Sequence, residues 1–317
     1  MSVPLYQLSE QQPTVWQPTT VEEALILKRK WGENSVLVSG GTWLRTRWEN
    51  GLSSPPQHLI SLGRIPALSG LTLDGQGHVH IGPALCLADV MENQMMKQRC
   101  GLLVQACSEI AAPSVRNLAS IGGNVMTRTG DLIPVLLVMN AQVVVSDGQK
   151  ERVLWLEEWL QDLNYSSFEV MTRIVVPGQV SAQMNDAGQT PTELRNTDAE
   201  HSFYLKVGRR EAFTPSVVTV AGRIRIEADG TVAAIALSAG GGSAVPSRFT
   251  ELEDALAGKL LIKEVLQILH KGVSDSFDAV ADDYAGAAYR KMTAANLIVS
   301  ECYKAWRKGG GAGASRS

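Results

Sequence analysis

The sequence contains two short glycine-centred stretches, Leu37-Val38-Ser39-Gly40-Gly41-Thr42 and Ala119-Ser120-Ile121-Gly122-Gly123-Asn124. In each, a diglycine adjoins Ser, Thr or Asn, so that main-chain amides and short polar groups can approach an anion without Cβ atoms in the way. One diglycine is common in ordinary turns and would carry little weight. Two of them indicate a pyrophosphate held from both sides by main-chain amides, and hence a dinucleotide.

The first diglycine follows a helix and a short strand. Residues 18–32 predict a helix capped by Thr19 or Thr20, with acidic residues in the first turn, basic residues in the last turn and Gly32 at its end. Residues 35–38 then predict a buried strand that runs into the glycine turn. A Rossmann domain starts instead with strand, GxGxxG and helix, and the sequence has neither that motif nor GxxxxGK[ST]. Both standard nucleotide folds are therefore disfavoured.

The rest of the chain predicts mixed helix and strand. Strands are expected at 58–62, 78–82, 142–146, 217–222, 223–227 and 232–239, and helices at 87–107, 131–139, 250–269 and 285–306. Residues 177–200 are rich in Gly, Gln, Asn, Asp, Thr and Pro, which is typical of a linker. The predicted division is a first domain at 1–178, a linker at 179–200, a second domain at 201–307 and a flexible tail at 308–317.

Composition excludes several classes of protein. The chain has 317 residues, 44% of them hydrophobic and 19% charged, as in an ordinary globular protein of two domains. A net charge of -3 without any Lys/Arg block argues against nucleic-acid binding. No apolar run reaches the roughly 18 residues that a membrane span needs, and the N-terminus does not resemble a secretory signal. We expect a cytoplasmic protein.

Cysteine and histidine do not indicate a metal site. The four cysteines, Cys86, Cys100, Cys107 and Cys302, lack the close spacing of iron–sulfur or structural zinc ligands, so we expect reduced thiols. The pair His78 and His80 would share one face of a strand, but two residues do not make a metal site. Trp155 and Trp159 lie at helical spacing and are expected in the core. The cluster Gly240-Gly241-Gly242 favours a hairpin or bulge over a ligand contact.

In order and spacing, a longer series of motifs resembles the FAD-binding subunit of molybdenum hydroxylases, the family of xanthine dehydrogenase, carbon monoxide dehydrogenase and aldehyde oxidoreductases. The resemblance extends from about residue 14 to about residue 306. It is carried by Val38 to Thr42, Ile81-Gly82-Pro83-Ala84, Arg116 to Asn124, Asp131-Leu132-Ile133-Pro134, Leu205-Lys206-Val207-Gly208-Arg209-Arg210, Val217 to Ala221, Pro246-Ser247-Arg248, Leu256 to Lys259 and Tyr289-Arg290.

This resemblance implies an α+β fold. An N-terminal FAD-binding domain of the vanillyl-alcohol-oxidase/p-cresol-methylhydroxylase type, made of two α/β subdomains, would precede a smaller α+β domain like the C-terminal domain of the carbon monoxide dehydrogenase flavoprotein. FAD would lie between the parts.

The resemblance also implies a set of FAD-binding residues. The first phosphate loop would be Leu37, Val38, Ser39, Gly40, Gly41, Thr42, Trp43 and Leu44, and the second Ala119, Ser120, Gly122, Gly123 and Asn124. Ile110 would pack against the cofactor, Asp131 would help to hold its nucleotide part, and Lys206 would lie close to the flavin. The chain departs from the family at Trp43, where relatives often have a small or acidic residue, and in the shortened segment 125–130. Within that segment, Arg128 either contacts phosphate or a partner, or is solvated.

The function implied by the resemblance is electron transfer within a heterotrimer. The partners would be an iron–sulfur subunit and a molybdopterin subunit. Electrons would pass through the clusters to FAD and leave to NAD or another acceptor, and no residue of this chain would act on the organic substrate. Two alternatives stay open: a self-contained flavoenzyme of the same superfamily, and a non-catalytic subunit that has lost FAD.

Overall fold

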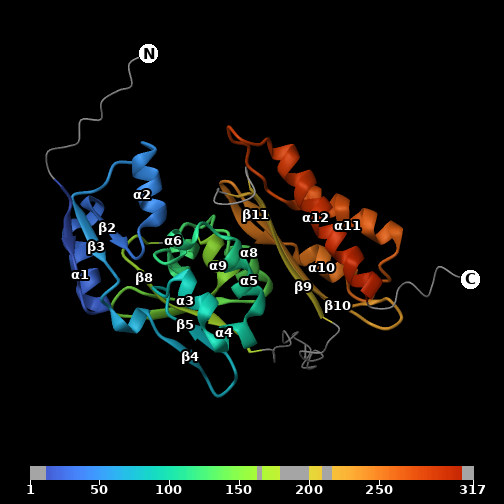
Figure 1. Cartoon of the computed structure of the whole chain (residues 1–317), viewed down its shortest axis with the longest axis horizontal. Coiled ribbons are helices and arrows are strands. Elements are labelled where there is room, and N and C mark those ends of the chain that lie inside the picture. The colour runs from blue at the N-terminus through green and yellow to red at the C-terminus, as the bar shows by residue number, and fades with distance from the viewer. Residues whose placement is uncertain (1–11, 163–165, 179–199, 209–215, 309–317) are drawn as a thin grey trace, which may run out of the picture.

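The computed structural model describes residues 12–162, 166–178, 200–208 and 216–308. These residues form three sheets, each with its own helices (Figure 1). Two sheets belong to the N-terminal half and the third to the C-terminal half. The predicted fold class, two α/β subdomains followed by an α+β domain, is confirmed. The predicted linker, the tail and the pair Arg209 and Arg210 fall largely or wholly outside the described residues.

The first sheet is small and parallel, with strand order β1 (Thr14–Trp16), β3 (His58–Ser61), β2 (Ser35–Val38). Helix α1 (Val21–Trp31) packs on it. Its predicted limits are confirmed: the Thr20 side chain accepts a hydrogen bond from the Glu23 amide at 3.1 Å, and Gly32 ends the helix at φ 51°.

Helix α2 (Thr42–Glu49) follows the first glycine turn and was not predicted. None of its residues is buried, so its sequence lacks the apolar stripe by which helices are recognised. Two short 3₁₀ segments also occur here: Gly32–Asn34 precedes β2, and Pro66–Leu68 follows β3.

The second sheet is antiparallel, with strand order β4 (Leu71–Leu73), β5 (Val79–Ile81), β8 (Val170–Val176), β6 (Gln142–Ser146), β7 (Glu151–Trp155). Its helices are α3 (Leu87–Glu92), α4 (Gln94–Arg99), α5 (Gly101–Glu109), α6 (Pro113–Arg116), α7 (Ile121–Met126), α8 (Ile133–Val138) and α9 (Leu156–Gln161). The helix predicted at 87–107 is therefore three helices, because Asn93 caps α4 through its side chain and the backbone leaves helical geometry again at Cys100.

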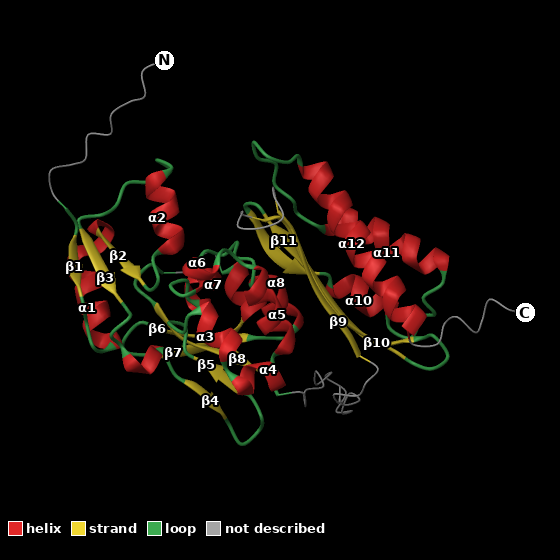
Figure 2. Cartoon of the chain, in the orientation of Figure 1, coloured by secondary structure: helices red, strands yellow, loops and turns green. Residues whose placement is uncertain are grey.

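The third sheet is also antiparallel, with strand order β12 (Ala244–Arg248), β11 (Val232–Gly241), β10 (Ser216–Ile226), β9 (Glu200–Gly208). Helices α10 (Thr250–Leu256), α11 (Lys263–Ser276) and α12 (Ala287–Lys308) lie on its outer side, away from the other sheets (Figure 2).

Two elements of the C-terminal half differ from their predicted limits. The two strands predicted at 217–227 are the single strand β10. Gly222 sits in its middle because an added Cβ would lie 2.4 Å from the Phe203 ring. The predicted helix 250–269 breaks at Gly258, where φ is 73°.

The two halves share a core. Every residue of α8 is buried, and this helix contacts β10, β11 and β12 of the C-terminal sheet. Tyr204 of β9 and Ala221 of β10 belong to the same hydrophobic cluster as the helices of the second sheet. The junction between the halves therefore includes continuous apolar packing.

Several side-chain predictions can be checked against burial. Trp159 is fully buried as expected, whereas Trp155 is 46% exposed at the end of β7, so its placement in the core was wrong.

The imidazoles of His78 and His80 both contact Asp74, at 3.2 Å and 3.0 Å. Within the described ranges, no group of three or more His, Cys, Asp or Glu side chains could hold a metal ion. None of the helices in those ranges combines the length and the apolar composition needed to cross a bilayer.

Burial predicts how the four free thiols react. Burial raises the pKa of Cys100, Cys107 and Cys302 to about 12, whereas Cys86 is only partly buried and its pKa rises less. Thiolate is the reactive form, so Cys86 should react first at pH 8. We expect a titration with a chromogenic disulfide to find one fast thiol in the folded chain and four in denaturant. Loss of the fast phase in Cys86→Ser would identify it, and a fast phase retained in that variant would contradict the assignment.

Candidate cofactor site

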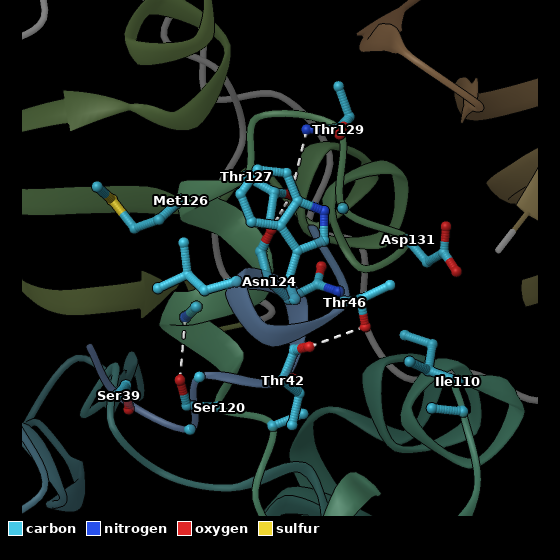
Figure 3. Close-up of a pocket in the computed structure, with 18 of the residues that line it drawn as sticks. Ser39, Thr42, Thr46, Ile110, Ser120, Asn124, Met126, Thr127, Thr129 and Asp131 are labelled. Atoms are coloured by element: carbon cyan, nitrogen blue, oxygen red, sulfur yellow. Dashed lines mark hydrogen bonds between the residues drawn. The ribbon is translucent and has the colours of Figure 1, made fainter. Parts of the chain in front are cut away.

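A cavity of about 670 Å³ lies where the three units meet. Both predicted loops, α2, the segment after α7 and the C-terminal sheet contribute to its wall, and Figure 3 shows Ser39, Thr42, Ser120, Asn124 and Asp131 around it. Its volume falls within the ordinary range for a site that takes a large organic ligand.

Among the described residues, no hydrogen bond uses the first main-chain amides of α2, and these residues line the cavity. Gly41 adopts a left-handed conformation, with φ 67°, and turns the chain from β2 into α2. Gly41 is also the N-cap of α2 and has no side chain to cap it. The amides of Thr42, Trp43 and Leu44 therefore form an uncapped helix N-terminus on the cavity wall, which is a favourable place for an anion.

The second loop is built differently. The amides of Ile121, Gly122 and Gly123 donate to the Leu85 carbonyl, the Pro83 carbonyl and the Ser120 hydroxyl, at 3.0, 2.8 and 3.1 Å. The Asn124 amide donates to the Ser120 carbonyl. These four donors are already used, so the prediction that both loops offer a row of main-chain amides is wrong for the second loop.

The second loop supports the first loop by direct contact. A Cβ added at Gly40 would lie 1.7 Å from the carbonyl oxygen of Leu118 and 3.1 Å from the nitrogen of Ala119. Only glycine lets the two chains approach this closely. Gly122 has a related role, since its Cβ would lie 2.3 Å from Pro83 and it does not line the cavity.

Asn124 organises the shortened segment that follows α7. Its side-chain oxygen accepts from the Leu132 amide at 3.0 Å, and an added Cβ at Gly130 would lie 2.2 Å from that same oxygen. The segment between them lines the cavity through Met126, Thr127 and Thr129 (Figure 3). The segment therefore keeps Asp131 on the cavity wall.

Asp131 is held by the C-terminal half. Its two oxygens accept a hydrogen bond from the Ser216 hydroxyl at 2.5 Å and pair with the Lys206 ammonium at 2.9 Å. The side chains of Lys206 and Asp131 are only 10% and 14% exposed. The resemblance assigned Asp131 to the nucleotide part and Lys206 to the flavin. The ion pair holds both groups together on the cavity wall, and the part of FAD that each would contact stays a prediction.

A buried phenol lies close to this ion pair. The Tyr204 hydroxyl is buried and has no hydrogen-bond partner among the described residues. Burial, followed by the negative charge of Asp131, raises the pKa of Tyr204 well above its ordinary value. Tyr204 is therefore a neutral residue of the core near Asp131.

The arginines near the cavity have structural partners. Arg128, at φ 60°, donates to the carbonyls of Trp159, Leu160 and Asp162 at the end of α9 and lies over the Trp159 ring. Its guanidinium is thus bonded within the protein, and the residue remains partly exposed. Arg116 donates in the same way to the carbonyls of Ser108, Ile110 and Ala111 at the end of α5.

A fully buried arginine supports the C-terminal side of the cavity. Arg290 donates to the Val217 carbonyl and pairs with Asp282 at 2.5 Å. A Cβ at Gly242 would lie 2.3 Å from the Arg290 guanidinium, and Gly242 itself lines the cavity. The third glycine cluster does form the expected bulge, because the β11–β12 register shifts there, but it also reaches the site.

Most predicted residues line the cavity. They are Leu37, Ser39, Gly40, Gly41, Thr42, Trp43, Leu44, Ile110, Ala119, Ser120, Gly123, Asn124, Asp131 and Lys206, whereas Val38 and Gly122 do not. The lining residues that the sequence did not indicate are Lys28, Val36, Thr46, Leu87, Ala111, Val115, Met126, Thr127, Thr129, Gly130, Ser167, Ser216 and Gly242. Gly130, next to a predicted site residue, and Gly242, in the third glycine cluster, are the two of these that offered a signal in the sequence.

The geometry of the cavity defines a class of protein. A cavity shared by three units, with an uncapped helix N-terminus on its wall and an ion pair at one end, suits an extended ligand that carries a diphosphate. Such a site is typical of a dinucleotide-binding protein.

Family comparison makes the class specific. Residues 9–179 match the model described as "FAD binding domain in molybdopterin dehydrogenase", and residues 203–305 match "CO dehydrogenase flavoprotein C-terminal domain". The chain belongs to this family, and its cofactor is FAD. It is an FAD-binding subunit of the molybdenum hydroxylase family.

Individual relatives agree with this assignment. The nicotinate dehydrogenase FAD-subunit of Eubacterium barkeri is 22% identical, over 81% of this chain and 85% of its own length. The 6-hydroxypseudooxynicotine dehydrogenase complex subunit alpha of Paenarthrobacter nicotinovorans is 24% identical, over 90% and 92%. A chain from the structure of carbon monoxide dehydrogenase from Hydrogenophaga pseudoflava has the same fold, with a TM-score of 0.79 at 24% identity over 93% of this chain and 98% of that one.

Proposed function

We propose that this chain is the electron-transfer subunit of a heterotrimeric, xanthine dehydrogenase-like molybdenum hydroxylase. Its partners would be an iron–sulfur subunit and a molybdopterin subunit, and NAD or another acceptor would take the electrons. The observation that carries the proposal is the single cavity shared by α2, the second loop and the Lys206–Asp131 pair. The curated relatives support it, because their names describe an FAD subunit and a subunit of a dehydrogenase complex.

The residues of this chain would hold and insulate the cofactor rather than act on a substrate. FAD, when bound, accepts and releases electrons singly or in pairs. The amides of Thr42, Trp43 and Leu44 would hold its diphosphate without a long cationic side chain. The Ser120 hydroxyl and Ile110 would contact it from the second α/β unit. In this proposal the organic substrate binds another subunit, in keeping with the different substrates named for the two relatives.

The ion pair shapes the charge that the flavin meets. Lys206 is compensated by Asp131, which is also bonded to Ser216, so this end of the cavity carries little net charge. The Lys206 ammonium would still be the nearest cation to negative charge on the reduced ring system. We further propose the domain limits 1–178 and 201–307, the linker and tail given above, and a cytoplasmic location.

Purification of the native complex through a tag on this chain tests the proposal. We expect two further polypeptides, iron, molybdenum and about one FAD per copy of this chain. A lone chain that turns over a substrate would favour a self-contained flavoenzyme. A colourless chain that cannot be reconstituted with FAD would favour a subunit that has lost the cofactor.

The electron acceptor can be tested separately. NADH should bleach the visible absorption of the reconstituted chain if NAD is the acceptor, because hydride transfer is reversible. Bleaching by dithionite but not by NADH would assign the electrons to another acceptor and leave the rest of the proposal intact.

A further inference from the structure

Lys28 is a buried cation on the wall of the cavity. It lies in the last turn of α1, where a basic residue ordinarily complements the helix dipole from the surface. Here the residue is only 5% exposed and lines the cavity together with Val36, Leu37 and Ser167. The helix dipole does not require this burial, so another interaction must offset its cost.

The protein satisfies only part of the bonding capacity of this ammonium. Its Nζ donates to the carbonyls of Gly32 at 2.9 Å and Ser35 at 2.8 Å. The Phe168 ring centroid lies 5.6 Å away, a contact that stabilises charge but accepts no conventional hydrogen bond. No carboxylate pairs with Lys28 within the described ranges. An ammonium has three donors, so one remains for a ligand in the cavity.

The position of Lys28 defines which part of an extended ligand it can meet. Ser35 begins β2, and the glycine turn with the free amides follows the other end of that strand. At roughly 3.3 Å per residue, the path from Ser35 to Ser39 spans about 13 Å. A diphosphate held at the N-terminus of α2 is therefore too distant for Lys28. One terminal group of the dinucleotide would instead reach it, and the other would lie toward Lys206 and Ser216.

Chemistry distinguishes the two terminal groups. In the proposed function, the Lys206 ammonium is the nearest cation to the reduced ring system, so the flavin would occupy the end of the cavity at the C-terminal half. The Lys28 end is buried, and the adenosine half needs no contact with a partner. Adenine ring nitrogens and ribose oxygens are neutral acceptors suited to a single donor.

We propose that Lys28 binds the adenosine half of FAD by donating its remaining N–H to that half. Its other two N–H groups hold the α1–β2 connection through the Gly32 and Ser35 carbonyls. This rests on the proposed function, in so far as the cavity holds FAD. Lys28 then favours a dinucleotide over a flavin mononucleotide.

Competition binding on the full-length, FAD-depleted chain tests the inference, with ADP and FMN as competitors of FAD. In Lys28→Met, we expect the affinity for ADP to fall about tenfold, the usual effect of losing one charge-assisted hydrogen bond, and the affinity for FMN to change less than about twofold. Lys30→Met is the matched control, because Lys30 lies on the same helix and is exposed. It should leave both affinities unchanged.

A second variant separates binding from folding. Lys28→Gln retains two N–H donors for the Gly32 and Ser35 carbonyls but leaves none for the ligand, so it should fold and show the same selective loss of ADP. Equal loss of ADP and FMN affinity, or no loss of either, would overturn the inference. If the unsubstituted chain bound no FAD at all, the proposed function itself would fail instead.

Discussion

Gly40→Ala is expected to abolish FAD retention. The new Cβ would lie 1.7 Å from the Leu118 carbonyl oxygen and 2.5 Å from the Leu118 carbonyl carbon. Both atoms are main chain, so no rotamer change can relieve the clash and the two loops must separate. Overpacking of this kind costs about 1–3 kcal/mol or more, and it displaces the N-terminus of α2 that faces the ligand. The FAD content after gel filtration measures the effect.

Two other glycines calibrate this result. Gly70→Ala is the control, since nothing lies within 4 Å of its added Cβ, and it should retain FAD fully. Gly123→Ala should have a smaller effect than Gly40→Ala, because its Cβ approaches only the movable Ser120 hydroxyl, at 2.8 Å. Full FAD retention in Gly40→Ala would show that the contact between the loops does not support the site.

Asp131→Ala is expected to lower the free energy of unfolding by about 3 kcal/mol, because it removes the carboxylate that pairs directly with the buried Lys206. It also removes the acceptor of the Ser216 hydroxyl. Urea unfolding of the FAD-free chain gives the value without a contribution from ligand binding. The double variant Asp131→Asn with Lys206→Met should recover much of the loss, since neither charge then remains.

A surface ion pair provides the comparison. Arg45 and Glu49 are 77% and 60% exposed, and such pairs contribute at most about 1 kcal/mol. Arg45→Ala should therefore have little effect on unfolding. If Asp131→Ala cost no more than Arg45→Ala, the pair with Lys206 would not stabilise the junction between the two halves.

The sequence predicted elements whose signals are local. The cap at Thr20, the stop at Gly32 and the strand that enters the first diglycine all follow from short-range chemistry. Helix α2 was missed because none of its residues is buried and it has no apolar face to recognise. The formation of such a helix depends on its tertiary contacts rather than on a periodic pattern of apolar residues.

The sequence predicted the parts of the site that contain a recognisable motif. It did not predict the contacts between segments that are distant in the sequence. The diglycines identified the two loops, but only the fold shows that Gly40 meets Leu118 whereas Gly122 meets Pro83. Lys28 looked like an ordinary surface lysine at a helix end. Ser216 carried no signal, since its partner Asp131 is 85 residues away in the sequence.

Tyr204 has a consequence for the evolution of such chains. Its ring belongs to the C-terminal sheet but fills the core of the N-terminal half, alongside Ala221. Neither half is then a complete folding unit by itself, because each would expose apolar surface that the other covers. Exchange of the C-terminal half between relatives would require matched changes on both sides of this junction. The two halves should therefore be inherited together, and recombination between them should be rare.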